Sequence, residues 1–258
     1  MKKHGFTLAE VLITLGIVGV VAALTAPALV MSSRNEANAA RLSSTVSLLE
    51  NAFHNAIIEE GVDEFSATSI ASNLASRHAT IGNLGKYLVF ANADYNLGDK
   101  PGDFYSGATT PTSMTSTGAK NTSDANAVTG ELNISSGPYK NVINLKNGAT
   151  VFFKLTGGRT TEAQRTAAIA AGRTLYSTAG WCLIDVNGKS APNTVGRDIF
   201  LFKIGQNGSL YPHGGSDYGN KDKEDKDVTW QQTCANNSIT DSWSCTARVI
   251  AEGYKINY

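Results

Sequence analysis

This sequence of 258 residues contains little cysteine and histidine, and neither sign of charge is in excess. The three cysteines and four histidines lack the spacing of a zinc site, a CxxC redox motif or an HExxH motif. G-x-S-x-G and P-loop motifs are missing as well. Lys and Arg number 22, as do Asp and Glu, so no net field attracts nucleic acid. These absences argue against an enzyme, a resident cofactor and a nucleic-acid partner.

Apolar residues are concentrated near the N-terminus. Residues 6–31 contain one charged side chain, that of Glu10. As a helix, residues 6–30 would be about 37 Å long, enough to cross a hydrocarbon core of about 30 Å. Lys2 and Lys3 precede this run and should stay on the cytoplasmic side. The sequence therefore predicts a single-pass protein whose remaining chain lies outside the cytoplasm.

Two ordinary readings of this segment compete with a more specific one. It could be a secretory signal peptide, with an apolar region at 12–24 and small residues at 26–28, or an uncleaved signal anchor. Neither explains Glu10, because a carboxylate in a membrane helix costs about 2.5 to 3.5 kcal/mol at mid-bilayer and normally has a partner. An α-amino group created by cleavage before Phe6 would be such a partner, within one helix or on a staggered neighbour.

The segment Gly5-Phe6-Thr7-Leu8-Ala9-Glu10, followed by an apolar run, resembles the N-terminal signal of type IV prepilins and type II secretion pseudopilins. The resemblance implies that a prepilin peptidase cleaves after Gly5 and methylates the new terminus at Phe6. It also implies that Glu10 acts in filament assembly. Residues 1–5 would then be a leader peptide and residues 6–30 the transmembrane and assembly helix.

Gly19 and Pro27 agree with this resemblance, since many family members carry a proline at this place in the first helix. Proline removes one backbone hydrogen bond and glycine lowers helix propensity. The stretch 19–27 is therefore where we expect the helix to bend or melt during assembly. The alternative is a plain membrane helix, in which both residue types are tolerated.

Beyond the apolar run the pattern becomes amphipathic. Apolar residues recur every three or four positions, as on one face of a helix, at Leu42, Val46, Leu49, Phe53 and Ile57. Gly61 is a suitable stop. The pattern predicts one helix from about Phe6 to Glu60, roughly 80 Å long, in which residues 31–61 pack on a head.

Residues 62–258 should form that head. Short helices are expected near 67–77 and 81–90, and an exposed loop at about 105–130, where Ser, Thr and Gly dominate. A type I′ turn at Asn147-Gly148 should join strands at 142–146 and 150–154. Further strands are expected at 181–186, 199–204 and 209–211, and a short helix or strand at the C-terminus. The predicted fold class is α+β: a long N-terminal helix packed on a small antiparallel sheet, as in pilins.

Two further sites are hypotheses. Cys234 and Cys245 are the preferred disulfide pair, although Cys182 is a possible partner because sequence does not fix connectivity. A glycine-containing loop also supplies oxygen ligands that suit calcium, from Asp185, Asn187, Asn193 and Asp198. Some secretion pseudopilins carry calcium near the C-terminus, but turns use the same residue types and the spacing is not that of an EF-hand.

The resemblance implies a structural subunit of a type IV pilus or of a type II secretion pseudopilus. Such a subunit is held in the bacterial inner membrane with its N-terminus in the cytoplasm, and then enters a periplasmic or cell-surface filament. Its partners would be membrane lipid, prepilin peptidase, an inner-membrane assembly platform and further copies of itself. The alternative is a minor pilin or tip adhesin, a binding module on the same anchor. Copy number would distinguish the two.

Overall fold

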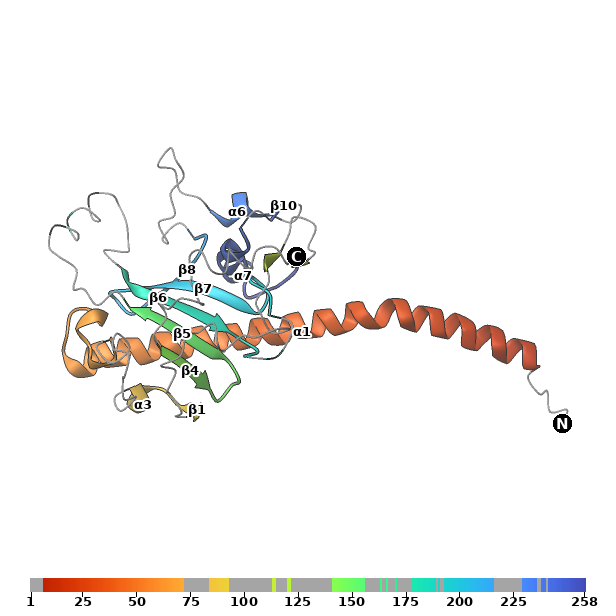
Figure 1. The fold of residues 1–258 in the computed structure, drawn as a ribbon, viewed down its shortest axis with the longest axis horizontal. Helices are drawn as coiled ribbons and strands as arrows, with labels where there is room; N and C mark the ends of the chain where they lie inside the picture. The colour runs from red at the N-terminus through yellow and green to blue at the C-terminus, as the bar shows by residue number, and fades with distance from the viewer. Residues whose placement is uncertain are drawn as a thin grey trace.

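A computed structural model describes residues 7–71, 84–92, 113–114, 120–121, 141–155, 163, 166, 170, 178–188, 190, 193–215, 229–235, 238–239 and 241–258. It shows one long helix that projects from a mixed α+β head (Figure 1). This arrangement confirms the predicted fold class.

Helix α1 (Leu8–Glu60) contains 53 residues and is about 80 Å long. Thr7 caps its N-terminus, and Gly61 ends it in the left-handed conformation at φ 61°, donating its N–H to the carbonyls of Ile57 and Ile58. The predicted stop at Gly61 is thus correct. The amphipathic pattern also has the expected consequence, since the buried residues of α1 all lie between Ala39 and Ala56.

The head contains a six-stranded antiparallel sheet in the order β1-β4-β5-β6-β7-β8. Its strands are β1 (Phe90–Asn92), β4 (Asn141–Leu145), β5 (Thr150–Leu155), β6 (Thr178–Asp185), β7 (Ile199–Gly205) and β8 (Leu210–Pro212). Asn147 and Gly148 lie in the turn between β4 and β5, in which the N–H of Gly148 donates to the carbonyl of Leu145. A type I′ turn needs a positive φ at both central residues, and of these two only Gly148 has one, at 88°. The predicted position of the turn is therefore right and its predicted type is wrong. Strands β4 to β8 match the five predicted strand segments within a few residues.

Each face of the sheet is buried, and the two faces belong to different clusters. Alternate residues such as Val151, Phe153 and Cys182 join the α1 side chains in one cluster. The residues between them, such as Phe152 and Leu183, join Trp243 on the other face. Because both faces are covered, these strands are continuous apolar runs instead of alternating ones.

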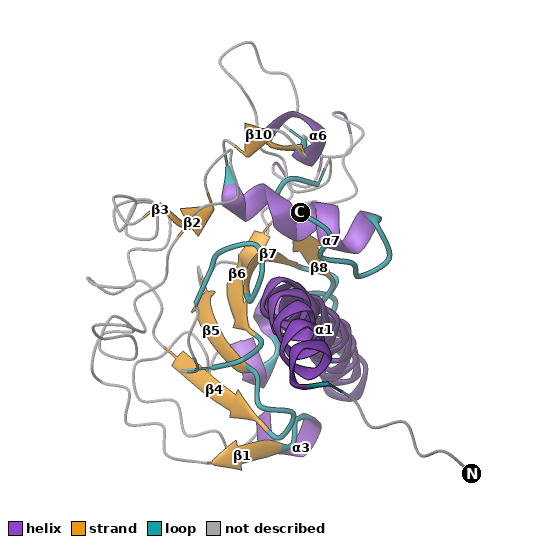
Figure 2. Cartoon of the chain, turned by 90° about the vertical axis from the view of Figure 1, so that its right-hand side faces the viewer, coloured by secondary structure: helices purple, strands orange, loops and turns teal. Residues whose placement is uncertain are grey.

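The last part of the chain forms a small lobe beside β7 and β8 (Figure 2). It consists of α6 (Trp230–Thr233), the paired strands β9 (Cys234–Ala235) and β10 (Ser238–Ile239), the 3-10 turn η7 (Ser242–Ser244), and α7 (Cys245–Ala251). Within this lobe, α7 is the predicted C-terminal helix. The elements α6, β9 and β10 were not predicted from the sequence.

Two predicted helices are only partly correct. In the first, the described residues give a 3-10 turn η1 (Phe65–Ala67) and helical residues 69–71, while 72–83 lie outside the described part. In the second, α3 (Leu84–Tyr87) is helical, but Phe90 begins strand β1 because it pairs with Leu145 of β4. Most of the predicted loop at 105–130 is also outside the described residues, apart from the paired strands β2 (Ser113–Met114) and β3 (Lys120–Asn121).

Candidate assembly site on the N-terminal helix

Glu10 lies in the first turn of α1, where it forms a reciprocal capping box with Thr7. The backbone N–H and the hydroxyl of Thr7 each donate to Glu10 Oε2 at 2.8 Å. In return, the backbone N–H of Glu10 donates to Thr7 Oγ1 at 3.2 Å. The box satisfies backbone groups that the helix leaves free at its start. It also gives the carboxylate partners inside its own chain, which the sequence analysis did not foresee although the Thr-x-x-Glu signal was present.

The cleavage residues Gly5 and Phe6 fall outside the described part of the chain. Glycine 19 lies in α1, and nothing is within 4 Å of the position that a Cβ would take there. Pro27 also lies inside the helix, which continues past it to Glu60. Because proline has no N–H, the carbonyl of Ala23 receives no helical hydrogen bond. These two residues are therefore weak points of an unsupported helix, as expected, but whether the helix melts there stays a prediction.

The projecting half of α1, residues 8–34, is exposed throughout. Its large apolar side chains are exposed by 41% at Val11 to 79% at Leu8. The others in this set are Leu12, Ile13, Leu15, Ile17, Val18, Val20, Val21, Leu24, Leu29, Val30 and Met31. Surfaces this apolar are covered in a working protein by lipid or by another protein. Helix α1 is long and apolar enough to cross a membrane.

The head is attached where the projecting half ends. Asn35 Nδ2 donates to the carbonyl of Ile256 at 3.0 Å, and Asn38 Nδ2 donates to that of Arg197 at 3.3 Å. Arg197 in turn donates to the carbonyl of Tyr258 at 2.6 Å, and the Tyr258 hydroxyl donates to the carbonyl of Gly196. The chain end and the loop before β7 are thus tied to one another and to a single stretch of α1.

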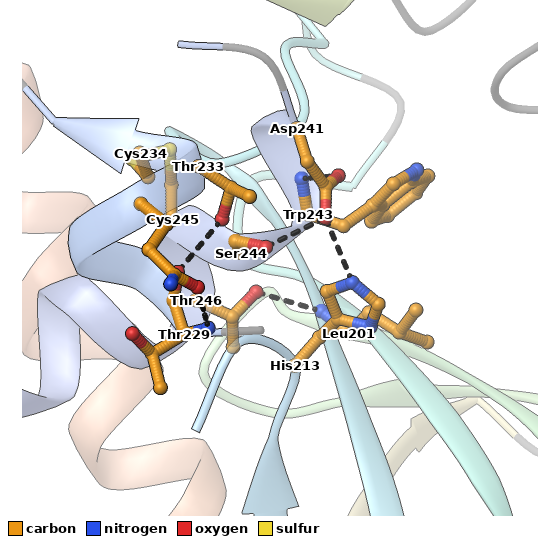
Figure 3. Close-up of polar contacts among 11 residues, drawn as sticks. Leu201, His213, Thr229, Thr233, Cys234, Asp241, Trp243, Ser244, Cys245 and Thr246 are labelled. Atoms are coloured by element: carbon orange, nitrogen blue, oxygen red, sulfur yellow. Dashed lines mark hydrogen bonds and ion pairs between the residues drawn. A yellow bond between two sulfur atoms is a disulfide. The ribbon is translucent and has the colours of Figure 1, made fainter. Parts of the chain in front are cut away.

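A polar network attaches the C-terminal lobe to the sheet (Figure 3). His213 Nε2 lies 2.9 Å from Asp241 Oδ2, and the Ser244 hydroxyl donates to the same oxygen at 2.6 Å. The N–H of Leu201, in β7, donates to Thr246 Oγ1 at 3.1 Å. The structure also joins Cys234 and Cys245 in a disulfide. Only the cysteine pair had a signal in the sequence, because His213 and Asp241 are far apart along the chain.

The ionisation of this network follows from its contacts. Burial alone would raise the pKa of Asp241, but the hydrogen bonds from His213, Ser244 and the Trp243 amide together hold that pKa below its ordinary value. Burial raises the pKa of the Cys182 thiol, because the residue is enclosed between the sheet and α1. Cys182 is therefore a packed apolar side chain and not a reactive thiolate.

The candidate calcium ligands lie in and around the turn between β6 and β7. Asp185 Oδ1 accepts the N–H of Asn187 at 3.1 Å, and Asp198 Oδ1 accepts the N–H of Thr194. Asn193, which lies between these two acids in the sequence, is also buried. Among the described residues, no group of three or more His, Cys, Asp or Glu side chains could hold a metal ion. These two carboxylate contacts are turn contacts, and calcium binding stays a prediction.

Fold and site together define a class of protein: an α+β head on one long helix whose exposed half suits a membrane. The first 26 residues match the model of the prokaryotic N-terminal methylation motif. The chain therefore carries the type IV pilin and pseudopilin signal, which confirms the resemblance seen in the sequence. No curated protein and no solved structure matches the chain.

Proposed function

We propose that this protein is a structural subunit of a type IV pilus-like filament or a type II secretion pseudopilus. In this proposal a prepilin peptidase cuts after Gly5 and methylates Phe6, and the subunit waits in the inner membrane with its head outside. Assembly then places the projecting half of α1 in a helical bundle of identical helices. The observation that carries the proposal is the 26-residue motif on a helix whose apolar half has no cover within the described chain.

Glu10 has a specific role in this proposal. In the free subunit its carboxylate is held by Thr7, so it can rest near the membrane surface without a second chain. During assembly the α-amino group of Phe6 on an adjacent subunit would replace these contacts by an ion pair. A charged partner gives a stronger hydrogen bond than a neutral one, so the exchange favours the filament and sets the register of the subunits.

Replacing Glu10 tests this role. We expect Glu10→Ala and Glu10→Gln to be cleaved at Gly5 but not to assemble, because neither carries the negative charge. Glu36→Ala is the matched control, since it removes an exposed carboxylate from the same helix. Cleavage is measured by mass spectrometry of the mature N-terminus, and assembly by shearing and electron microscopy. Normal filaments from Glu10→Ala would contradict the ion pair, and a chain that retains Met1 would contradict the whole proposal.

The tip or minor-pilin alternative shares the anchor and differs in abundance. A filament subunit self-associates and is recovered along the filament, whereas a tip protein is scarce and lies at one end. Immunogold labelling of the head on isolated filaments separates the two functions. Labelling confined to filament ends would favour the binding module.

A further inference from the structure

The part of the head nearest to the projecting half of α1 lies beside the end of the apolar segment of that helix. No charged residue occurs between Glu10 and Arg34, a stretch of 23 residues. As a helix this stretch is about 35 Å long, slightly more than the hydrocarbon thickness of about 30 Å. When α1 spans a membrane, Arg34 therefore lies at the lipid headgroups. Whatever the head places beside Arg34 lies there too.

Two cations of the head share this level. Arg197 Nη1 lies 3.7 Å from the sulfur of Met31, which is about one helical turn before Arg34 in α1. Lys255 precedes Ile256, whose carbonyl accepts from Asn35, the neighbour of Arg34. Figure 2 looks along α1 from its projecting end and shows the C-terminus beside the helix. We call Arg34, Arg197 and Lys255 the basic rim.

The charge of the rim is available to a ligand. Arg34 and Lys255 are exposed. Arg197 is half-buried: one terminal nitrogen donates to the Tyr258 carbonyl, the other lies against Met31, and its Nε is buried. Arg197 therefore adds positive charge to the rim, while Arg34 and Lys255 are the groups that can contact a phosphate directly. Glu36 is the exposed acid next to this level, so it offsets part of the charge. Two further acids lie near the rim: Glu252 accepts from Arg248 at 2.9 Å, and the buried Asp198 accepts the N–H of Thr194.

We infer that the basic rim binds the phosphate groups of anionic phospholipids while the subunit is anchored in the membrane. Guanidinium and ammonium groups bind phosphate through charge-assisted hydrogen bonds, and basic groups beside a membrane segment are attracted to anionic lipid. The hydrogen bonds of Asn35 and Asn38 to the head hold the rim at a fixed position along α1, so the head would rest on the bilayer surface. Extraction into a filament would then have to break these contacts. The inference rests on the membrane anchoring in the proposed function.

The test uses the full-length chain in mild detergent, with equal amounts of phosphatidylglycerol and phosphatidylcholine. Native mass spectrometry counts which lipid is retained. We expect a preference for phosphatidylglycerol that falls at least fivefold in Arg34→Gln/Lys255→Gln, since each cation near a surface contributes roughly a factor of five. Neither residue of this pair has a side-chain contact on which the described fold depends.

The matched control is Arg41→Gln/Lys146→Gln, which removes the same charge from two exposed positions farther from the projecting half, one on α1 and one in the turn after β4. Arg41 is seven residues, or about 10 Å, beyond Arg34, and Lys146 lies in the turn whose Asn147 contacts Thr45. We expect this variant to keep the preference. Equal retention of both lipids by the unmodified chain would overturn the inference, as would an equal loss in both double variants.

Two further measurements separate the possible causes. Inorganic phosphate added without lipid should not raise the Tm of the chain; a rise that the rim substitutions remove would assign the site to free phosphate and overturn the lipid proposal. Cleavage after Gly5 and filament assembly are scored separately for each variant. Normal filaments without any lipid preference would reject the rim alone, whereas an uncleaved chain would reject the proposed function.

Discussion

The two halves of α1 share one backbone and have different surroundings. In residues 8–34 every side chain is exposed, and the large ones are almost all apolar. In residues 35–60 most of the large apolar side chains form one stripe that is buried on the sheet, whereas Ile58 is exposed. A helix that is apolar all round suits lipid or a bundle of helices, whereas a striped helix suits the surface of a domain. The change of pattern near Arg34 thus divides α1 into an exposed projecting half and a half that packs on the head.

Substitution in the packed half should have the largest effect on the head. Phe53 is fully buried, with ring centroids 4.5 Å from Phe65 and 6.3 Å from Phe153. We expect Phe53→Ala to lower the free energy of unfolding by about 3 to 5 kcal/mol, because it leaves a cavity. The measurement is denaturant unfolding of the full chain in detergent, followed by tryptophan fluorescence. All three tryptophans lie in the head, at 181, 230 and 243.

The control for Phe53 lies in the projecting half. Val18 is 62% exposed, so Val18→Ala should change the unfolding of the head by less than about 0.5 kcal/mol. Filament assembly should respond in the opposite order, because Val18 would be buried between subunits. If Val18→Ala destabilised the head as much as Phe53→Ala, the division of α1 into two parts would be wrong.

The disulfide should have the next largest effect, because it closes a loop within the lobe beside β7 and β8 (Figure 2). Cys234 and Cys245 are 11 residues apart in sequence. For a loop of this length we expect Cys234→Ser/Cys245→Ser to cost about 2 to 4 kcal/mol. A reductant should destabilise the Cys182→Ala variant to the same extent and leave the double serine variant unchanged. Sensitivity of the double variant to reductant would mean that another group is responsible.

Substitutions at two glycines in turns, Gly208 and Gly148, distinguish the cost of a clash with α1 from the cost of backbone strain alone. Gly208 and Gly148 have φ of 83° and 88°, where an L side chain is strained by about 1 to 2 kcal/mol. A Cβ at Gly208 would lie 2.9 Å from His54 Cδ2 and 3.3 Å from Phe53 Cβ, both on α1, whereas one at Gly148 would meet nothing within 4 Å. We therefore expect Gly208→Ala to cost about 1 kcal/mol more than Gly148→Ala. If the two variants lost the same free energy of unfolding, the side chains of α1 would be able to move away from a Cβ at position 208 without cost.

Much of this arrangement could be predicted from the sequence, for local reasons. The spacing of Leu42 to Ile57 predicts a helix, Gly61 ends it, and Asn147-Gly148 joins two strands. These signals act within a few residues, so each is complete in the sequence. The prepilin signal is equally local, and the family motif at residues 1–26 confirms it.

The missed features depend on contacts between distant parts of the chain. Phe90 begins a strand only because β4 lies beside it, and two-residue strands such as β9 and β10 show no period in the sequence. The proposed rim depends on the backbone at Arg197 and at Ile256 meeting the same stretch of α1, which no local pattern records. The Thr7 to Glu10 capping box is different, because its Thr-x-x-Glu signal is local and complete in the sequence.

The smallest effect should come from acid, and it tests how the lobe is held. The pKa of Asp241 is lowered in the folded state, so the ionised carboxylate stabilises the fold above the unfolded pKa of about 3.9. This contribution is lost as the pH falls from about 4 through the folded pKa, because the folded state must then take up a proton. We expect Asp241→Asn to reduce the dependence of Tm on pH between about 5 and 3. Asp63→Asn, in the turn after α1, is the control and should keep the dependence of the unmodified chain. If both variants followed the same curve, the contacts of His213 and Ser244 with Asp241 would not be what makes the lobe sensitive to acid.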